Sequence, residues 1–97
     1  MHVVKCSTIK LFWEKHPDSS EALKTWCKLL KSINFRDFHE LKEYFGTADN
    51  IGMNRVVFNI KGNHYRLIAK INYTKGRVFI RFIGTHKEYD RIDSTSV

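Results

Sequence analysis

The sequence predicts an α+β fold of two layers, in which a helical hairpin and a short third helix pack on one face of an antiparallel β-sheet. Apolar residues recur at helical spacing before about Gly46 and alternate at strand spacing after Met53. The chain has 97 residues, 42% of them hydrophobic, which is enough for one core and too few for two. We therefore expect a single domain over residues 1–97, with a disordered polar tail at residues 94–97.

The first half of the chain predicts an extended segment followed by a helical hairpin. The β-branched residues within Met1–Lys5 favour an edge strand. Ser7 is a candidate N-cap for a first helix, which Pro17 ends. Ser19 or Ser20 can cap a second helix, whose apolar stripe follows helical spacing: Leu23, Trp26, Cys27, Leu30 and Ile33. The other face of this helix is basic: Lys24, Lys28 and Lys31.

A third, shorter helix is expected from Asp37 to Phe45, with Asp37 as its N-cap and Gly46 as its terminator. Within it, the run Phe38-His39-Glu40-Leu41-Lys42-Glu43 is similar to the zinc-binding HExxH motif, but Glu stands where the motif requires a second His. We therefore interpret this run as a solvated helix face. Residues 47–53 are expected to form a loop.

The second half predicts an antiparallel meander of three strands, Arg55–Ile60, Tyr65–Tyr73 and Arg77–Ile83. Tight turns join them at Gly62 and Gly76, because glycine accepts the positive φ that such turns need. Alternate residues of a strand point to opposite faces, and the helices are expected to cover one set: Leu67, Ile71, Val78 and Phe82. Four cations then project from the opposite, open face, which we call the basic strand face: Arg66, Lys70, Arg77 and Arg81.

Positive charge is concentrated in this second half. Residues 55–91 contain nine Lys and Arg against two Asp and Glu, whereas residues 1–54 contain eight against seven. A localised basic field favours nucleic acid or an acidic protein as the partner. The alternative is a solvated sheet face kept soluble by its charge, although such a face normally mixes both signs.

Several other classes of protein lack support in the sequence. The apolar runs are too short to span a membrane, and the first residues lack the apolar core of a secretion signal. The two cysteines, Cys6 and Cys27, are too few for a disulfide scaffold and are interpreted as reduced, mostly buried thiols. We therefore expect a cytoplasmic protein with no membrane partner.

His86 follows the last predicted strand and lies beside the basic strand face, with Lys87 and Tyr89 as sequence neighbours. Imidazole titrates near neutral pH, so a histidine here can give or take a proton, although a lone histidine is more often structural. RNA supplies its own nucleophile, the 2′-OH group, so its cleavage needs only a base, an acid and cations for the charged phosphorane. Histidine, tyrosine, lysine and arginine side chains can act as this base, acid and source of positive charge without a metal ion or a cofactor.

Three segments together resemble the HigB family of toxins from bacterial toxin–antitoxin systems: Val57–Ile68, Phe79–Phe82 and Thr85–Asp90. These segments cover about a third of the chain. The first half of the chain is similar to the family only in its layout, a helical hairpin that precedes the sheet. The resemblance implies the RelE-like superfold and cleavage of mRNA, commonly in translating ribosomes. It also implies silencing by a cognate helix-turn-helix antitoxin.

The charge pattern and the resemblance together define a candidate site. Arg66 and Arg81 are expected to hold and neutralise the scissile phosphate, while His86 and Tyr89 serve proton transfer. Further contacts to RNA are expected from five residues: Lys61, Asn63, Lys70, Arg77 and Lys87. No metal or cofactor is expected.

Two other functions stay open. A non-catalytic module that binds RNA or the ribosome could arrest translation by occupancy, and a purely structural interaction protein could also carry a basic surface. An antitoxin could cover either the basic strand face or the helical hairpin. We favour the hairpin, because its Lys-rich helix offers a docking surface away from the candidate site and bulk alone could exclude the toxin from the ribosome.

Overall fold

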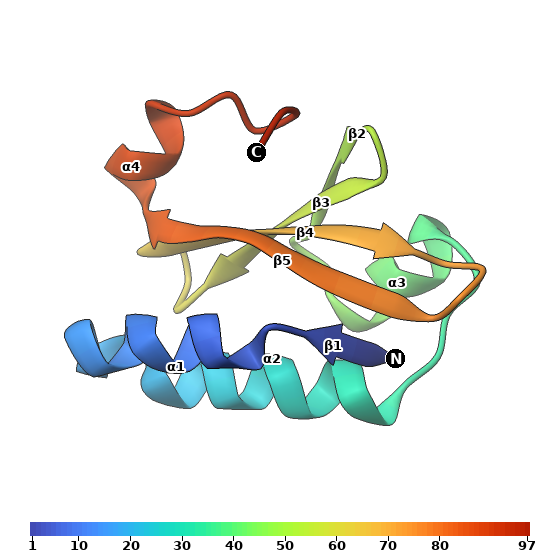
Figure 1. Cartoon of the computed structure of the whole chain (residues 1–97), viewed down its shortest axis with the longest axis horizontal. Helices are drawn as coiled ribbons and strands as arrows, with labels where there is room; N and C mark the ends of the chain where they lie inside the picture. The colour runs from blue at the N-terminus through green and yellow to red at the C-terminus, as the bar shows by residue number, and fades with distance from the viewer.

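The computed structural model describes all 97 residues and confirms the α+β fold, with helices packed on a five-stranded sheet (Figure 1). In chain order the elements are β1 (His2–Val4), α1 (Cys6–Lys15), the 3-10 turn η1 (Pro17–Ser19), α2 (Ser20–Ser32), α3 (Phe38–Tyr44), β2 (Asp49–Gly52), β3 (Arg55–Ile60), β4 (Tyr65–Asn72), β5 (Arg77–Thr85) and α4 (His86–Asp90). None of the helices has the length and apolar character needed to cross a membrane.

The sheet has the strand order β1-β5-β4-β3-β2. The predicted meander is confirmed, because β3, β4 and β5 pair as antiparallel neighbours. The edge strand expected at the start of the chain is β1, which pairs with β5 in the parallel direction. The loop expected over residues 47–53 is wrong in part, since Asp49 pairs with Val57 and forms β2. Asp and Asn are poor strand formers, and here pairing with β3 outweighs that weak preference.

The starts of the first two helices differ from the expected caps. Helix α1 begins at Cys6 after Lys5, which has a φ of 69° and makes no side-chain cap, so the expected Ser7 cap is wrong. Ser19 does precede α2, but its hydroxyl donates to the carbonyl of His16 at 2.7 Å and caps no backbone N–H. The two helices also meet through Cys6 and Cys27, whose Sγ atoms lie 2.9 Å apart, and burial raises the pKa of Cys27 to about 11.

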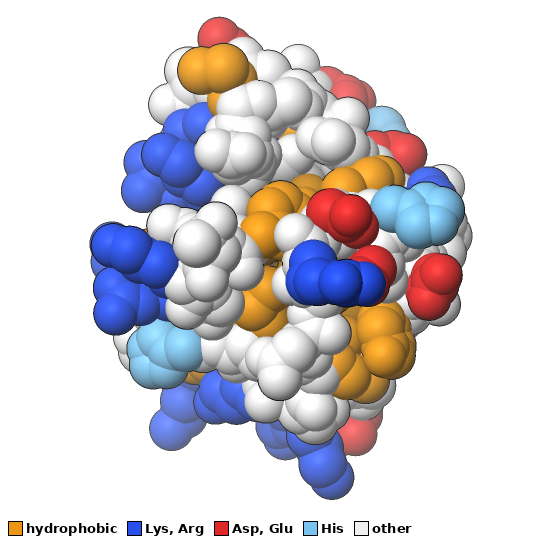
Figure 2. Space-filling model, turned by 90° about the vertical axis from the view of Figure 1, so that its right-hand side faces the viewer, with side chains coloured by type: hydrophobic (Ala, Val, Ile, Leu, Met, Phe, Trp, Pro, Cys, Tyr) orange, Lys and Arg blue, Asp and Glu red, His pale blue; other side chains and the backbone are white.

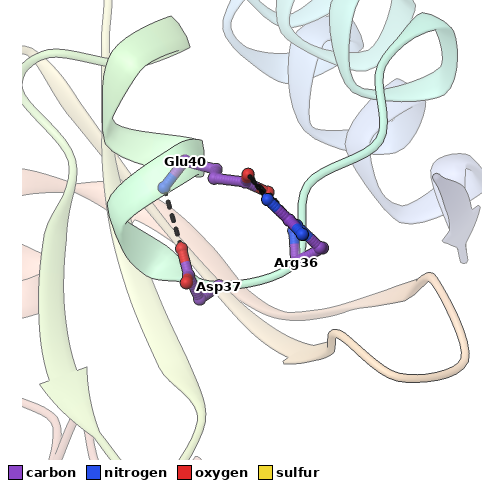
Figure 3. A network of polar contacts seen from close by, with 3 residues as sticks. All are labelled: Arg36, Asp37 and Glu40. Atoms are coloured by element: carbon purple, nitrogen blue, oxygen red, sulfur yellow. Dashed lines mark hydrogen bonds and ion pairs between the residues drawn. The ribbon is translucent and has the colours of Figure 1, made fainter.

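Helix α3 begins at the predicted cap (Figure 3). The Asp37 side chain accepts a hydrogen bond from the backbone N–H of Glu40 at 3.0 Å. The Glu40 carboxylate also pairs with Arg36, with 3.1 Å between Oε2 and Nη2. The Arg36 guanidinium and its backbone N–H together lower the pKa of Glu40 below its usual range. Glu40 therefore stabilises the start of the helix, and the segment has no zinc-binding geometry.

The hydrophobic core lies between the sheet and the helices α1, α2 and α3. Leu23 and Leu30 of the predicted α2 stripe are fully buried in it. Trp26 packs edge-on against Phe58, with 5.3 Å between the ring centroids. Phe45, at the end of α3, contacts the same Phe58 ring at 5.1 Å. One aromatic side chain of β3 thus joins two helices to the sheet.

A β-bulge in β5 reverses the predicted orientation of the strand's last residues. Ile68 pairs with Phe82 and Ala69 pairs with Ile80, so Arg81 is the extra, unpaired residue. One inserted residue turns every following side chain to the opposite face. Ile83 therefore packs against the core, and the expectation that Phe82 shares the face of Val78 is wrong.

The opposite face of the sheet is only partly open, because α4 and the C-terminal segment lie over it (Figure 1). Ile68 and Val57 are buried on this face, away from the main core. Arg55 is also buried and donates two hydrogen bonds to the backbone oxygen of Val97, at 3.0 and 2.8 Å. The expectation of a fully open face is wrong for its centre. The disorder expected for residues 94–97 in solution stays a prediction.

Candidate functional site

Helix α4 is fixed to the end of β5 by its first residues. Thr85 and Glu88 form a capping box, in which Glu88 N–H donates to Thr85 Oγ1 at 3.2 Å and Thr85 N–H donates to Glu88 Oε1 at 2.9 Å. The hydrogen bond from the Thr85 backbone is the main reason that the pKa of Glu88 is lowered. This helix was not predicted, because its five residues are too few for a helical period to appear in the sequence. The sequence feature that indicates the start of this helix is the Thr-x-x-Glu spacing of Thr85 and Glu88, which is typical of a capping box.

Arg66 and Tyr89 lie against each other on this face. The Arg66 guanidinium carbon lies 5.4 Å from the centroid of the Tyr89 ring, a cation–π arrangement. Its Nη2 donates to Asn63 Oδ1 in the β3–β4 turn at 3.4 Å. Arg66 Nε and Asn59 Oδ1 are buried without partners, on residues that are paired across β3 and β4. Buried polar atoms without partners are costly, and they mark positions where a substrate or an ordered water can supply the missing bond.

The close approach of α4 to the sheet depends on Gly84, which pairs with Arg66 across β4 and β5. A Cβ atom at this position would come within 2.7 Å of Phe82 Cζ and 3.1 Å of Glu88 Oε1. Gly84 thus leaves the space that the helix and the Phe82 ring occupy beside Arg66.

His86 is the first residue of α4, three positions before Tyr89. Its Nδ1 lies 3.1 Å from Asp90 Oδ2, and its backbone N–H donates to the carbonyl of His64 at 3.3 Å. A carboxylate at Nδ1 favours the tautomer with the proton on Nδ1, which leaves Nε2 able to accept a proton. No role was predicted for Asp90, and the sequence feature that indicates this contact is its i, i+4 spacing from His86. We call Arg66, Tyr89, His86 and Asn63 the Arg66–Tyr89 cluster.

Arg81 and Lys70 do not join this cluster. Arg81 occupies the bulge and donates from Nε to the backbone oxygen of Val97 at 3.3 Å. Lys70 lies four residues from Arg66 along β4, a distance of about 13 Å. Both line an open cavity of about 530 Å³ at the other end of the face. The predicted site is thus divided into two groups.

The remaining predicted RNA contacts are more scattered. Lys61 Nζ lies 3.0 Å from Asp18 Oδ2 in η1, so this lysine is already paired within the protein. Arg77 is exposed at the start of β5, the opposite end from α4. Lys87 is exposed on α4, next to His86. Among the five predicted contacts, Asn63 and Lys87 lie with the Arg66–Tyr89 cluster, Lys70 lines the cavity, and Lys61 and Arg77 lie apart.

Asp18 has a second partner besides Lys61. The Tyr65 hydroxyl donates to Asp18 Oδ1 at 2.6 Å. This hydrogen bond, followed by the one from Lys61, lowers the pKa of Asp18 below its usual value of 3.8. The contact joins η1 of the helical layer to the start of β4, the central strand of the sheet.

Charge is unevenly distributed over the surface. Figure 2 shows Lys and Arg side chains gathered along the left and lower edges of one face, while most visible Asp and Glu side chains lie on the right. No group of three or more His, Cys, Asp or Glu side chains in the chain is arranged to hold a metal ion.

Comparisons with known proteins agree with the resemblance of the three segments. A family model described as "HigB_toxin, RelE-like toxic component of a toxin-antitoxin system" matches residues 19–92. The mRNA interferase HigB of Escherichia coli O6:H1 is 29% identical over 94 residues, which is 95% of this chain and 91% of the relative. The mRNA interferase HigB of Shigella flexneri is 30% identical over 92 residues, which is 93% of this chain and 88% of the relative.

Proposed function

The chain belongs to the HigB family of RelE-like toxins of toxin–antitoxin systems, and from this membership we propose that it is an endoribonuclease that cleaves mRNA and thereby inhibits translation. The observation that supports it best is the Arg66–Tyr89 cluster, where a guanidinium lies against a phenol at the end of the basic strand face and an imidazole lies one turn earlier on the same helix as the phenol. Translation takes place in the cytoplasm, and we place the toxin there.

The reaction we propose uses the RNA's own 2′-OH group. Its oxygen attacks the adjacent phosphorus, the bond to the 5′-oxygen breaks, and a 2′,3′-cyclic phosphate forms. One proton leaves the 2′-OH and one reaches the 5′-oxygen, and we assign these transfers to His86 Nε2 and the Tyr89 hydroxyl; the Nδ1 contact of His86 with Asp90 supports this assignment. Arg66 neutralises the charge that develops on the phosphorane.

The position of Arg81 favours a different role from the one expected for it. Its guanidinium lies at the bulge, beside the cavity and outside the Arg66–Tyr89 cluster. We assign it to a neighbouring phosphate rather than to the scissile one. Arg66 is then the cation at the reacting centre.

The test of catalysis compares wild type with His86→Ala in growing cells, with mRNA 5′ ends mapped during growth arrest. We expect wild type to produce new 5′ ends and the variant to produce few, because proton transfer to the RNA is lost. His39→Ala is the matched control, since His39 is an exposed histidine on α3, away from the cluster. An equally active His86→Ala variant would remove His86 from the mechanism.

The same experiment separates cleavage from occupancy. Translation that stops without new 5′ ends would favour a non-catalytic module that binds RNA or the ribosome. Cleavage that persists with chelator and purified components would support a reaction independent of added metal. Cleavage that requires ribosomes in the mixture would support action on translating mRNA.

Membership of the family implies an antitoxin partner, and we propose that it is a helix-turn-helix protein that docks on the α1–α2 hairpin. The hairpin offers Leu11, which is 63% exposed, and Lys24, whose Nζ lies 5.5 Å from the centroid of the Trp13 ring. An apolar contact beside lysines suits an amphipathic, acidic segment. Reversal of Arg66 and Arg81 should leave the affinity for the antitoxin unchanged, and a large loss of affinity would place it on the basic strand face instead.

A further inference from the structure

We propose that the cavity beside the β-bulge is a nucleotide-binding subsite, in which Phe79 stacks on a base and Lys70 and Arg81 hold the adjoining phosphate. The proposal rests on the proposed ribonuclease function and concerns how the RNA on either side of the cut is held. It adds a second binding point, remote from the Arg66–Tyr89 cluster.

The cavity has a size and a lining that suit a nucleotide. It measures about 530 Å³, within the usual range for small-ligand pockets. Lys70 and Phe79 are direct partners across β4 and β5, and Arg81 follows two residues after Phe79 on the same strand. An aromatic ring is thus flanked by two cations on one surface. This combination is typical of single-stranded nucleic acid sites, where rings stack on bases and cations follow the backbone.

The polar groups of the cavity are largely free to bind a ligand. Lys70 is exposed and has no acidic partner. Arg81 uses only Nε within the protein, so both of its Nη atoms are available. The side chain of Asn54 makes no hydrogen bond, and Asn72 uses only its Oδ1, which accepts from the backbone N–H of Lys75 at 3.0 Å. Side-chain amides of this kind can hydrogen-bond to the edge of a base.

The distance between the two sites determines which part of the RNA reaches the cavity. Arg66 and Lys70 are separated by about 13 Å along β4. That distance is longer than one nucleotide covers, so a base in the cavity belongs to a neighbour of the residue that is cut. Arg81 is the extra residue of the bulge, so it has no partner in the ladder, and it lines the cavity together with Phe79.

The test uses Phe79→Leu, which removes the ring and keeps an apolar side chain, and Lys70→Gln, which removes an exposed charge. For each variant, mapped 5′ ends give the base preference around the cut. Fluorescence anisotropy with a fully 2′-O-methylated RNA oligonucleotide, which lacks the nucleophile, gives the affinity. Lys75→Gln, in the β4–β5 turn outside the cavity, is the control for charge, and Phe38→Leu on α3 is the control for the ring.

We expect Phe79→Leu to relax the base preference at one position away from the cut and to weaken RNA binding roughly 5- to 150-fold, the range for loss of one base–aromatic stack. Lys70→Gln should weaken binding to all sequences alike. Wild-type preference and affinity in both variants, with unchanged melting temperatures, would overturn the subsite. If wild type makes no new 5′ ends, the ribonuclease function fails, and the affinities alone decide whether the cavity binds RNA.

Discussion

Arg66 is the residue whose surroundings are most specific. Its guanidinium contacts the Tyr89 ring and Asn63 at once, and its Nε is buried without a partner. A planar guanidinium group suits such a position, because it can stack on the ring and still direct two N–H groups toward a phosphate. A lysine at this position would keep the positive charge but would lose the planar group that stacks on the ring and donates through two N–H groups.

Arg66→Lys should therefore reduce the rate of mRNA cleavage roughly tenfold or more, with little change in thermal stability. Single-turnover cleavage of a defined mRNA measures the rate. Arg36→Lys is the matched control, because Arg36 pairs with Glu40 on the exposed start of α3 and should leave the rate unchanged. A fully active Arg66→Lys variant would show that charge alone is needed at this position.

Asp18 gives a prediction for the dependence of stability on pH. Its pKa is lowered first by the Tyr65 hydroxyl and then by Lys61, so its contribution to stability is present above about pH 3.8 and is lost as the pH falls through the lowered value. Asp18→Asn should lower the melting temperature at pH 7, and the difference from wild type should shrink below about pH 3.8. In a Tyr65→Phe background the effect should be smaller. An equal difference at pH 3 and pH 7 would contradict this explanation.

At the scale of elements, the sequence predicts best where the pattern is long. The α2 stripe and strands β4 and β5 each repeat their spacing several times, so most of the side chains that face the core could be assigned. β2 and α4 have four and five residues, too few for a period to appear. No glycine or proline in the sequence indicates the bulge at Arg81. This bulge is the reason that Phe82 was assigned to the wrong face of the sheet.

The same argument explains the outcome for the candidate site. Arg66 meets Tyr89 because α4 directly follows β5, which pairs with β4, and His86 lies one turn before Tyr89 on α4. Arg81 was predicted to lie with them, because regular alternation along a strand without a bulge puts Arg81 and Arg66 on the same face. The contact of Asp90 with His86 was not predicted, because it requires the helix α4, which is too short to show a helical period in the sequence.

Gly84→Ala tests the packing of α4 on the sheet. The new Cβ would lie 2.7 Å from Phe82 Cζ and 3.2 Å from Glu88 Cβ, so the helix or the ring must move. We expect a cost of about 1–3 kcal/mol in the free energy of unfolding, as for overpacking elsewhere. Cleavage by the folded variant should fall further, because His86 and Tyr89 move with the helix. Gly46→Ala, where nothing lies within 4 Å of the added Cβ, should change neither quantity.

At the scale of the whole molecule, the two layers differ in what they can bind. Residues 55–91 contain nine basic residues against two acidic ones, and they form the sheet strands β3 to β5 and α4. Residues 1–54, which form α1 to α3 together with the edge strands β1 and β2, contain eight basic residues against seven acidic ones, and the lysines of α2 are exposed. A phosphate backbone is therefore attracted to one layer, and the other is left for a protein partner.

The location of the charge, rather than its total, should decide how RNA binding responds to salt. Each phosphate contact to single-stranded RNA contributes about 0.7 to the slope of log K against log salt. Neutralising Lys70 and Arg81 together should thus reduce the slope for 2′-O-methylated RNA by about 1.4. Neutralising Lys24 and Lys28 on α2 removes the same net charge from the other layer and should leave the slope unchanged. Equal reductions in the two double variants would show that RNA responds to net charge alone, and that the sheet face holds no dedicated phosphate contacts.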